Sequence, residues 1–389
     1  LAADSRHRVT FVTKRKQLEL PNVRRVTYDA PKPAGPATHH YVRQFETSVR
    51  YGQQVARVLL DLKREGINPA VVIGHPGWGE MLFVRDVFPR AAIVSYAEFY
   101  YQGRGADIGF DPADPADLDQ ICRARARNAH LLLSLEAADV GLAPTEWQRT
   151  RHPAIYQPKI RTIFDGIDVG TVRPDPAARL TLDDGVVLTI ADEVITYVAR
   201  NLEPYRGYPS FIRSLPAILD ARPAAHVVIT GGDEISYGKA APDGQTWRAA
   251  MEAEVPLLTR YPGRIHFTGK LGYGRYLDLL RISSVHIYLT VPFVLSWSCM
   301  EALACGCVVV ASDTAPVREV ITHGFNGLLV PMFDPAAIAL QVIDVLATPR
   351  AAQSAMRAAA RAQIIDLYAL EKCLPRQLQL VRDATNMTH

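Results

Sequence analysis

The sequence predicts an α/β protein with two doubly wound domains, each built on a parallel sheet, that face each other across a cleft. Three observations indicate this fold class. Apolar strand segments alternate with helical segments through both halves of the chain, several strands run into glycine-containing loops that open a helix, and 389 residues are enough for two domains of ordinary size. Because such sheets bind ligands at the carboxyl ends of their strands, we expect the ligand site in the cleft.

The N-terminal half shows the first alternation of strands and helices. Its apolar segments predict strands over 9–13, 70–73, 92–97 and 140–143, and its longer periodic segments predict helices over 42–65, 80–87 and 118–138. The polar segment up to Thr38 and the segment 99–119 are expected to be irregular, and Thr145 is a good N-cap for a further helix. The chain opens with the pattern of a helix end that enters a second strand, so we expect an earlier strand and loop to be missing from it.

The second half repeats this alternation. Strands are predicted over 194–198, 226–230, 265–268, 285–289, 308–311 and 328–330, and helices over 210–219, 247–258 and 274–282, from Ser296 and beyond Pro335. The turn at Asp165 and the proline segment 174–176 interrupt the pattern. We therefore expect an N-terminal domain over 1–167, a C-terminal domain over 168–365, and a last helix over 366–389 that packs back on the N-terminal domain.

Composition excludes several classes of protein. A formal net charge of +3 is too small for a nucleic-acid-binding protein, and no apolar run approaches the ~18 residues of a membrane span. The 5 cysteines are odd in number and lack metal-ligand spacing, which argues against disulfides and metal sites and suits a reducing cytoplasm; Cys305 and Cys307 are expected to be packing residues. The basic runs 14–16 and 24–25 favour a solvated surface, with peripheral contact to the inner face of a membrane as the alternative.

The segment from Ser296 to Ser312 is the most informative part of the chain. Ser296 and Ser298 are good N-caps for a short helix after a buried strand, and the amides and dipole of such a helix end suit a phosphate. Glu301 lies in its first turns, where its carboxylate could accept hydrogen bonds from sugar hydroxyls beside that phosphate. The alternative is an ordinary αβ unit in which the glutamate only favours the helix start.

Two arginines occupy the loop that follows the first strand of the second half. Arg200 and Arg206 bracket this loop, and Gly207 stands where the chain turns into the next helix. Arginine is permanently charged and presents a planar set of donors, so a pair of them could bind a diphosphate and stabilise the charge that develops as it leaves. Glycines follow the neighbouring strands at Gly231, Gly232 and Gly269. They and the Glu301 helix are predicted at the same edge of the same sheet.

Together these residues resemble a known family. The resemblance rests on Arg200, Arg206-Gly207, Gly231-Gly232, Gly269, the segments Glu301–Gly306 and Val309–Ser312, Glu319-Val320, Gly324 and Gly327–Val330. This set is similar to the C-terminal domain of the GT-B glycosyltransferases of family 4, over about residues 194–335. The segment Asp165–Asp168 likewise resembles the interdomain segment of that family. The resemblance implies the GT-B fold, in which two Rossmann-like domains face each other across a cleft.

The family resemblance also implies an activity. It is a retaining, metal-independent transfer of a sugar from a nucleoside-diphosphate sugar to a hydroxyl acceptor, which would be a glycan, a glycolipid or a small molecule of bacterial polysaccharide or glycoconjugate biosynthesis. No cofactor is implied, since the nucleotide sugar is a substrate. Arg200 and Arg206 would hold the diphosphate, and Glu301 would hold the ribose hydroxyls. The remaining donor-binding residues would be Gly207, Gly231, Gly232, Gly269, Val294, Leu295, Ser296, Trp297 and Ser298.

Phe293 departs from the family pattern. The family has a second glutamate at this position, eight residues before Glu301, that contacts the donor sugar. An aromatic ring cannot accept hydrogen bonds from sugar hydroxyls, so the backbone amides of 294–296 would have to replace the carboxylate, or the sugar would have to sit differently. Phe293 therefore leaves two questions open: which sugar the donor carries, and whether the protein has lost the activity of the family.

Two residues of the N-terminal half are candidate catalytic residues. His75 lies in the glycine-rich loop 74–79, where it could bond a substrate hydroxyl or cap a tight turn. Glu98 follows the strand 92–97, at a place where members of the family often have a histidine near the reacting centre. The surrounding segment 96–101 is acidic and aromatic, and both core packing and stacking on a sugar are open for its rings.

The implied mechanism needs no pair of protein carboxylates. The diphosphate would leave as positive charge develops at the anomeric carbon, and its departing oxygen would take the proton of the acceptor hydroxyl on the same face. Two rival functions are a nucleotide-sugar epimerase or hydrolase on the same fold and a catalytically silent sugar-nucleotide-binding protein. A dehydrogenase is disfavoured, since no Gly-x-Gly-x-x-Gly motif with a following ribose-binding acid is present.

Overall fold

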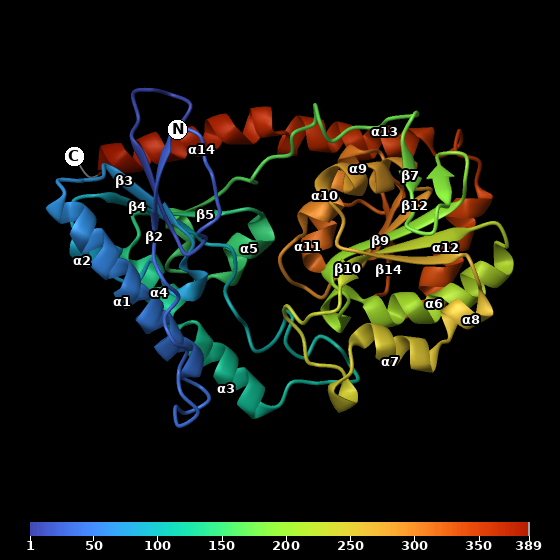
Figure 1. The fold of residues 1–389 in the computed structure, drawn as a ribbon, viewed down its shortest axis with the longest axis horizontal. Helices are drawn as coiled ribbons and strands as arrows, with labels where there is room; N and C mark the ends of the chain where they lie inside the picture. The colour runs from blue at the N-terminus through green and yellow to red at the C-terminus, as the bar shows by residue number, and fades with distance from the viewer. Residues whose placement is uncertain (388–389) are drawn as a thin grey trace. The chain divides into compact units, whose positions relative to one another are not determined.

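The computed structural model describes residues 1–387 and divides the chain into two compact units. Unit 1 comprises Leu1–Phe164 and the end of the chain from Leu374, and unit 2 comprises Asp165–Cys373. The sequence placed its domain boundary after residue 167. Both units are α/β, and Figure 1 shows in each of them a central group of strands with helices around it.

Unit 1 contains two groups of parallel strands. The strands are β1 (Val9–Thr13), β2 (Val23–Thr27), β3 (Val71–Gly74), β4 (Ala92–Tyr96), β5 (Val140–Ala143) and β6 (Ile160–Thr162). Four of them form a sheet in the order β3-β4-β5-β6, and β1 and β2 form a separate pair. The helices are α1 (Arg43–Arg64), α2 (Val84–Val87), α3 (Leu118–Arg127), α4 (Ala129–Ala137) and α5 (Glu146–Arg151).

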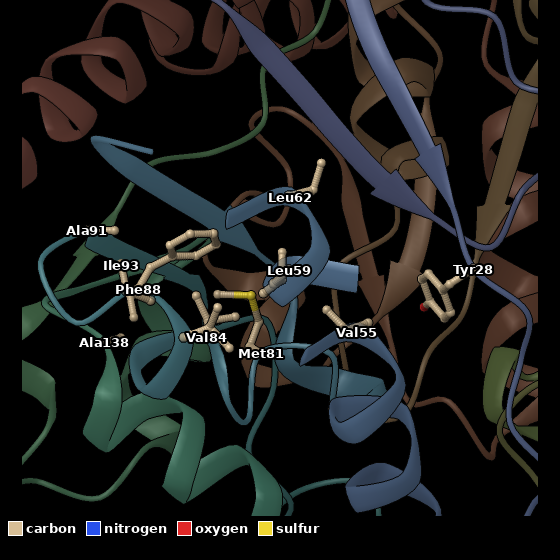
Figure 2. Packing of buried hydrophobic residues seen from close by; sticks show 11 residues of the cluster. Tyr28, Val55, Leu59, Leu62, Met81, Val84, Phe88, Ala91, Ile93 and Ala138 are labelled. Carbon is tan, nitrogen blue, oxygen red and sulfur yellow. The ribbon is translucent and has the colours of Figure 1, made fainter. Parts of the chain in front are cut away.

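One hydrophobic core joins these elements. Helix α1 contributes Val55, Leu59 and Leu62 to it, because residues three and four apart share a helix face. Figure 2 shows Leu59 next to Met81, with Phe88 from the end of α2 close by. Partly buried valines of β1, β2 and β3 pack against the same cluster, so the two groups of strands share one core.

Several predicted elements of unit 1 were wrong in extent. The sequence missed β2, because Val-Arg-Arg-Val-Thr lacks the alternation of a half-buried strand, and it missed the short β6. The helix expected over 80–87 is only Val84–Val87. The helix expected over 118–138 breaks at Asn128, whose side chain donates to Tyr101 O at 2.7 Å and accepts from Tyr101 N at 2.9 Å. This pairing holds the irregular segment before α3 against the break.

Unit 2 contains a six-stranded parallel sheet. Its strands are β9 (Val194–Asn201), β10 (His226–Gly232), β11 (Ile265–Gly269), β12 (Val285–Tyr288), β13 (Val309–Ser312) and β14 (Leu328–Val330). Their order in the sheet is β11-β10-β9-β12-β13-β14, so the direction of winding reverses between β9 and β12. The loops that leave these two strands diverge at that point, which is where doubly wound sheets bind ligands.

Helices cover both faces of this sheet. They are α6 (Tyr208–Ala221), α7 (Trp247–Glu254), α8 (Leu257–Arg260), α9 (Tyr273–Ile282), α10 (Trp297–Ala304), α11 (Ala315–Arg318), α12 (Pro335–Ala347) and α13 (Ser354–Gln363). In Figure 1, α6 and α7 lie on one side of the sheet and α9 and α10 on the other. The central strands are consequently buried on both faces, as the fully buried Val194, Ile195 and Ile287 show.

Two predictions for unit 2 were wrong in detail. The sequence missed the antiparallel hairpin of β7 (Arg179–Thr181) and β8 (Val187–Thr189). It also joined α7 and α8 into one helix over 247–258. The two helices are separate because Pro256 follows Val255, and a residue before proline avoids the helical conformation.

The chain leaves unit 2 through a π-helical segment, Ile364–Tyr368, and ends in α14 (Leu370–Met387). Arg376 Nη2 donates to Thr162 O at 3.1 Å, and Gln377 Nε2 donates to Phe164 O at 2.9 Å. Most of α14 therefore belongs to unit 1. The sequence predicted a last helix over 366–389 that packs on the N-terminal domain, of which residues 388 and 389 lie outside the described residues.

Residues 1–387 include no helix that is long and apolar enough to cross a bilayer. The same residues hold no group of three or more His, Cys, Asp or Glu side chains placed to bind a metal ion. None of the cysteines is in a disulfide in the part of the chain that the structure describes; Cys122 is partly buried, and the other four, Cys299, Cys305, Cys307 and Cys373, are buried. Burial raises the pKa of the Cys307 thiol to about 11, so it acts as a packing residue.

Candidate functional site

Arg206 links the two strands at the switch point of unit 2. It ends a 3-10 turn, Pro204–Arg206, after β9, and Gly207 follows it in the left-handed conformation with φ 66°. A side chain cannot stand at Gly207, because its Cβ would lie 2.4 Å from Leu289 Cβ. Arg206 Nη1 donates to Thr290 Oγ1 at 2.8 Å, in the loop after β12. The guanidinium is thus fixed across the switch point.

Arg200 lies near the end of β9 and meets the same tyrosine as Arg206. Arg200 Nη1 donates to the Tyr237 hydroxyl at 3.3 Å, and the Arg206 Cζ lies 5.9 Å from the centre of the Tyr237 ring. The structure thus brings the two predicted arginines to one place. Within residues 1–387, the side-chain hydrogen bonds of both arginines run through Nη1 and do not use Nε and Nη2.

Phe293 belongs to an aromatic cluster beside Arg206. Its ring centre lies 4.9 Å from that of Tyr237 and 5.5 Å from that of Tyr205, and it lies 5.9 Å from the Arg206 Cζ. The Phe293 side chain is buried. This ring therefore packs beside the arginine, where it offers an aromatic surface and no acceptor for a sugar hydroxyl.

The segment that leads into α10 is already hydrogen-bonded. The Ser296 amide donates to the Tyr288 hydroxyl at 2.8 Å, and the Val294 carbonyl accepts from Arg206 Nη1 at 3.4 Å. Ser296 caps α10 by accepting from Ser298 N at 3.3 Å. Of the two serines predicted as caps, Ser296 is the one that does so. Its amide is engaged by the tyrosine, which argues against this amide as the replacement for a missing carboxylate.

Leu295 and Trp297 flank this N-cap, and their side chains differ in exposure. Leu295 is buried, so only its backbone could reach a ligand. Trp297 is 54% exposed, and its Nε1 donates to Asp165 Oδ2 at 2.9 Å. This bond ties the start of α10 to the segment that begins unit 2.

Glu301 lies in α10 and is held by two tyrosines of α9. Its carboxylate oxygens accept from the Tyr273 hydroxyl at 2.8 Å and from the Tyr276 hydroxyl at 2.6 Å. Burial and the adjacent carboxylate raise the pKa of both tyrosines above the ordinary value, so the hydroxyls remain donors. Glu301 is only 6% exposed, and each of its oxygens can accept a further hydrogen bond. The sequence singled out Glu301 and missed both tyrosines.

The glycines after β10 and β11 have different surroundings. A Cβ at Gly231 would lie 2.8 Å from Leu202 Cδ2, and one at Gly232 would lie 2.6 Å from Lys270 Cε. Gly269 has a φ of 62°, and no described atom lies within 4 Å of its Cβ position. Packing against neighbouring loops explains the first two glycines, whereas Gly269 borders open space at the carboxyl end of β11.

His75 and Glu98 form a hydrogen-bonded pair in unit 1. His75 Nδ1 accepts from Gly77 N at 3.0 Å, which places the ring proton on Nε2, and Nε2 donates to Glu98 Oε2 at 3.0 Å. His75 is thereby the N-cap of the 3-10 turn Pro76–Trp78. The structure shows the capped turn, in which both ring nitrogens are engaged, and the contact with a substrate hydroxyl stays a prediction.

His130 of α4 holds the same turn from the other side. Its Nε2 lies 3.1 Å from Gly77 O, and since a carbonyl only accepts, Nε2 is the donor. Burial lowers the pKa of His130, so the ring is neutral near pH 7. The backbone N–H and the backbone carbonyl of Gly77 are therefore both held by histidines, and the sequence did not indicate the contact with His130.

Comparison with known families matches both units. Residues 5–172 match the family model described as "Glycosyl transferase family 4 group", and residues 186–363 match the model described as "Glycosyl transferases group 1". The two matches together cover most of the chain. This chain belongs to the family 4, group 1 glycosyltransferases. The predicted family membership, which was based on the arginine, glycine and glutamate pattern, is thus confirmed. The family match also extends to the N-terminal unit of this family 4 glycosyltransferase.

The curated relatives of this glycosyltransferase are distant. The D-inositol 3-phosphate glycosyltransferase of Segniliparus rotundus is 25% identical over 209 residues, which are 54% of this chain and 44% of the relative. The GDP-mannose-dependent alpha-(1-6)-phosphatidylinositol monomannoside mannosyltransferase of Mycolicibacterium smegmatis is 26% identical over 239 residues, which are 59% of this chain and 58% of the relative. The chain spans about half the length of these curated relatives.

Solved structures share the fold of this family 4 glycosyltransferase. The sucrose-phosphate synthase of Thermosynechococcus elongatus gives a TM-score of 0.68 at 18% identity, covering 96% of this chain and 88% of that one. HepE of Anabaena, solved with UDP and glucose, gives a TM-score of 0.63 at 15% identity, covering 93% and 87%. At these identities the likeness establishes the fold, and it confirms the predicted GT-B class with two Rossmann-like parallel sheets.

Sequence reasoning missed the side chains that hold the predicted ones in place. They are Glu203, Tyr205, Tyr237, Tyr273 and Tyr276. Glu203 was visible as the acidic residue between the two arginines in the sequence. The tyrosines come from separate loops and helices, so no spacing pattern connects them to the residues that they contact.

Proposed function

We propose that the protein is a retaining glycosyltransferase that moves a sugar from a nucleoside-diphosphate sugar to a hydroxyl acceptor. The observation that carries this proposal is the meeting of Arg200 and Arg206 at Tyr237, at the carboxyl edge of a doubly wound sheet. The guanidinium donors left unused there have the geometry and the permanent charge that phosphate oxygens require. Membership of the family 4 glycosyltransferases supports the same activity.

In this proposal the donor lies along the carboxyl edge of the unit 2 sheet. Its diphosphate binds Arg200 and Arg206, and its ribose hydroxyls bind the lone pairs that Glu301 keeps. The N-terminal end of α10 adds its amides and the positive end of its dipole. HepE was solved with UDP, and the Mycolicibacterium smegmatis relative is named for GDP-mannose, so UDP and GDP sugars are the donors to test first.

The proposed reaction breaks the bond between the anomeric carbon and a phosphate oxygen. The electron pair stays on that oxygen, and the two arginines stabilise the negative charge that it gains. The same oxygen accepts the proton of the acceptor hydroxyl, while the hydroxyl oxygen bonds to the anomeric carbon on the same face. The anomeric configuration is therefore retained, and neither a protein carboxylate nor a metal ion is needed to neutralise the leaving group.

The acceptor is the less determined substrate. We propose to test phosphorylated polyols and lipid-linked glycans first, because two relatives are named for inositol 3-phosphate and for a phosphatidylinositol mannoside. The free and mostly buried cysteines are consistent with work in the reducing cytoplasm. A lipid acceptor would add peripheral contact with the inner face of the membrane. His75 and Glu98 are proposed to shape the acceptor side of the reaction from unit 1.

A nucleotide-release assay tests this function. The protein is first screened against UDP, GDP and ADP by thermal shift, because a bound ligand raises the melting temperature by mass action. UDP-glucose and GDP-mannose are then incubated with and without inositol phosphates and phosphatidylinositol, and both the released nucleotide and the glycosylated product are measured. We expect nucleotide release to require an acceptor and to match the amount of product formed.

The same assay separates the two rival functions. Turnover of the donor at equal rates without any acceptor would identify the first rival: a hydrolase releases the nucleotide and the free sugar, and an epimerase yields the epimeric nucleotide sugar. Binding of a nucleoside diphosphate without transfer to any acceptor would identify a catalytically silent sugar-nucleotide-binding protein. The observation that motivates this second rival is Phe293, which places a buried ring beside Arg206 and offers no hydrogen-bond acceptor to the sugar.

A further inference from the structure

Glu203 is a buried carboxylate between the two arginines in the sequence. It is 1% exposed, and its Oε2 accepts hydrogen bonds from three consecutive backbone amides, those of Ser236 at 3.2 Å, Tyr237 at 3.1 Å and Gly238 at 3.1 Å. Its backbone carbonyl accepts from Arg206 N at 3.1 Å. One residue therefore holds both the turn that carries Arg206 and the backbone that carries Tyr237.

The three amides belong to the loop 233–245, which connects β10 to α7. Tyr237 is the residue of this loop that meets both arginines, through its hydroxyl to Arg200 at 3.3 Å and through its ring to the Arg206 Cζ at 5.9 Å. Its ring centre also lies 4.9 Å from that of Phe293. A shift of this loop would therefore move a side chain that touches both guanidinium groups.

Two other polar contacts of the loop involve Glu234 and Ser236. Lys270 Nζ pairs with Glu234 Oε2 at 2.5 Å, with 55% and 72% of the two side chains exposed. The Asn201 amide lies 2.7 Å from Ser236 Oγ. Exposed ion pairs contribute little to stability, whereas a buried carboxylate that loses its partners, or amides that lose a buried acceptor, carry the full cost of desolvation. Glu203, which accepts from three consecutive amides, is therefore a buried anchor of the loop.

We propose that Glu203 is a positioning residue for the diphosphate site, which it serves by fixing the loop 233–245 so that Tyr237 keeps Arg200 and Arg206 in place. The inference rests on the proposed function, because it concerns the same donor site. Glu203 itself is too buried to touch a ligand, so its effect reaches the donor only through Tyr237 and the arginines. A preformed pair of arginines needs no rearrangement when the donor binds, which is what makes such charges effective.

Glu203→Gln is the variant that tests this, with Glu193→Gln as its matched control. Both glutamates flank β9, but Glu193 precedes the strand at the opposite edge of the sheet and pairs with Arg222. Glutamine keeps the size of the side chain and loses the charge that strengthens the three hydrogen bonds. We expect Glu203→Gln to raise the KM for the donor and the Kd for UDP or GDP by about 10-fold to 100-fold, the range typical of residues that orient a ligand-binding group.

Trypsin supplies a readout that does not depend on catalysis. Lys239 is exposed and lies in the loop one residue after Gly238, so cleavage after Lys239, followed by mass spectrometry, reports how firmly the loop is held. We expect faster cleavage at this bond in Glu203→Gln than in the wild type, unchanged cleavage in Glu193→Gln, and a larger effect in Glu203→Ala. If the alanine variant does not fold, the glutamine variant still decides the question.

A double-mutant cycle with Tyr237→Ala tests the path of the effect. If Glu203 acts through Tyr237, the two substitutions together should raise the Kd for the nucleotide no more than the larger single change does, because they remove the same contact. Additive effects would overturn the proposal, as would cleavage after Lys239 at the wild-type rate in Glu203→Gln. A wild-type protein that binds UDP or GDP but transfers nothing would overturn the proposed function alone, since binding and cleavage would still decide the role of Glu203.

Discussion

The two candidate polar centres of the molecule differ in how much of their hydrogen-bonding capacity is already used. In unit 1, both ring nitrogens of His75 are engaged, one by Gly77 and one by Glu98. In unit 2, the hydrogen bonds of Arg200 and Arg206 to described residues use Nη1 and leave Nε and Nη2 without a hydrogen bond to those residues. A side chain whose donors are satisfied by its own fold organises backbone, whereas one with donors to spare can bind a substrate.

The largest effect is expected at Arg206. Arg206→Ala removes a fixed positive charge from the leaving diphosphate, and loss of one such group costs about 10²–10³ in rate. Transfer is measured as acceptor-dependent nucleotide release, with circular dichroism to check folding. Arg213→Ala is the control, because Arg213 lies on the following helix and pairs with Glu254 at the surface. If the Arg206→Ala enzyme turned over at the wild-type rate, the unit 2 centre would not be the substrate-binding one, and the difference proposed between the two centres would be wrong.

The second effect is expected at Glu301. If its free lone pairs bind ribose hydroxyls, the wild type should bind UDP more tightly than 2′-deoxy-UDP, and Glu301→Ala should bind both about equally. Hydrogen bonds to a charged group are worth about 1.5–3 kcal/mol, so the loss in UDP affinity should be about 10-fold to 100-fold. Calorimetric titration measures both ligands, with Glu254→Ala as the control. If the variant and the wild type prefer UDP over 2′-deoxy-UDP to the same extent, Glu301 does not bind the ribose, and its hydrogen bonds to Tyr273 and Tyr276 have only a structural role.

A third test concerns a buried histidine that has no part in either centre. His286 of β12 is fully buried, which lowers its pKa to about 3, and its Nδ1 lies 2.9 Å from Thr196 Oγ1. As the pH falls below about 6.5, His286 is therefore protonated in the unfolded chain but stays neutral in the folded chain. The free energy of unfolding is consequently highest above this pH and decreases below it. One such group lowers the free energy of unfolding by about 1.4 kcal/mol per pH unit between pH 6.5 and pH 5.

Urea unfolding at pH 7.5 and at pH 5 measures this slope. His286→Gln keeps a hydrogen-bonding side chain that does not titrate, so its slope should be smaller than that of the wild type by about one proton. The same slope in both proteins would contradict the buried, neutral state of His286. The comparison also shows how much of any pH dependence of activity comes from stability.

The smallest effects on transfer are expected at His75 and Glu98. His75→Ala removes the cap of the turn Pro76–Trp78 and should lower the free energy of unfolding by about 1 kcal/mol, a typical value for a lost cap. Transfer should fall much less than in Arg206→Ala, because no nitrogen of His75 is left for a substrate. Glu98→Gln, which keeps one hydrogen bond to His75, should be milder still. If His75→Ala lowered transfer as much as Arg206→Ala does, His75 would act at the reacting centre, and the difference between the two polar centres would not hold.

The sequence predicted the parts of this protein that local patterns determine. The buried strands β5 and β14 were predicted with their observed bounds, because short β-branched or small apolar runs between turns have few other interpretations. The arginines and Glu301 could be found because they follow strands that end at one edge of a sheet. The break at Asn128 could not be predicted, since it depends on hydrogen bonds to Tyr101, a residue distant in the sequence.

The supporting side chains of the site escaped prediction for the same reason. Tyr237 meets Arg200 and Arg206 only because the loop after β10 folds back over the loop after β9. Phe293 could be recognised as a departure from a family pattern, but its packing beside Arg206 depends on the loop after β12. Contacts between loops of neighbouring strands follow no sequence periodicity. The chemistry of Arg200, Arg206 and Glu301 could therefore be predicted from the sequence, but the side chains around them could not.

The structure of the protein in complex with a nucleoside diphosphate, UDP or GDP according to the thermal-shift screen, tests the central claim most directly. We expect the phosphates to lie between Arg200 and Arg206, within hydrogen-bond distance of their Nε and Nη2 groups, with the ribose toward Glu301. A nucleotide bound elsewhere, with both arginines still turned to Tyr237 and free of phosphate, would contradict it.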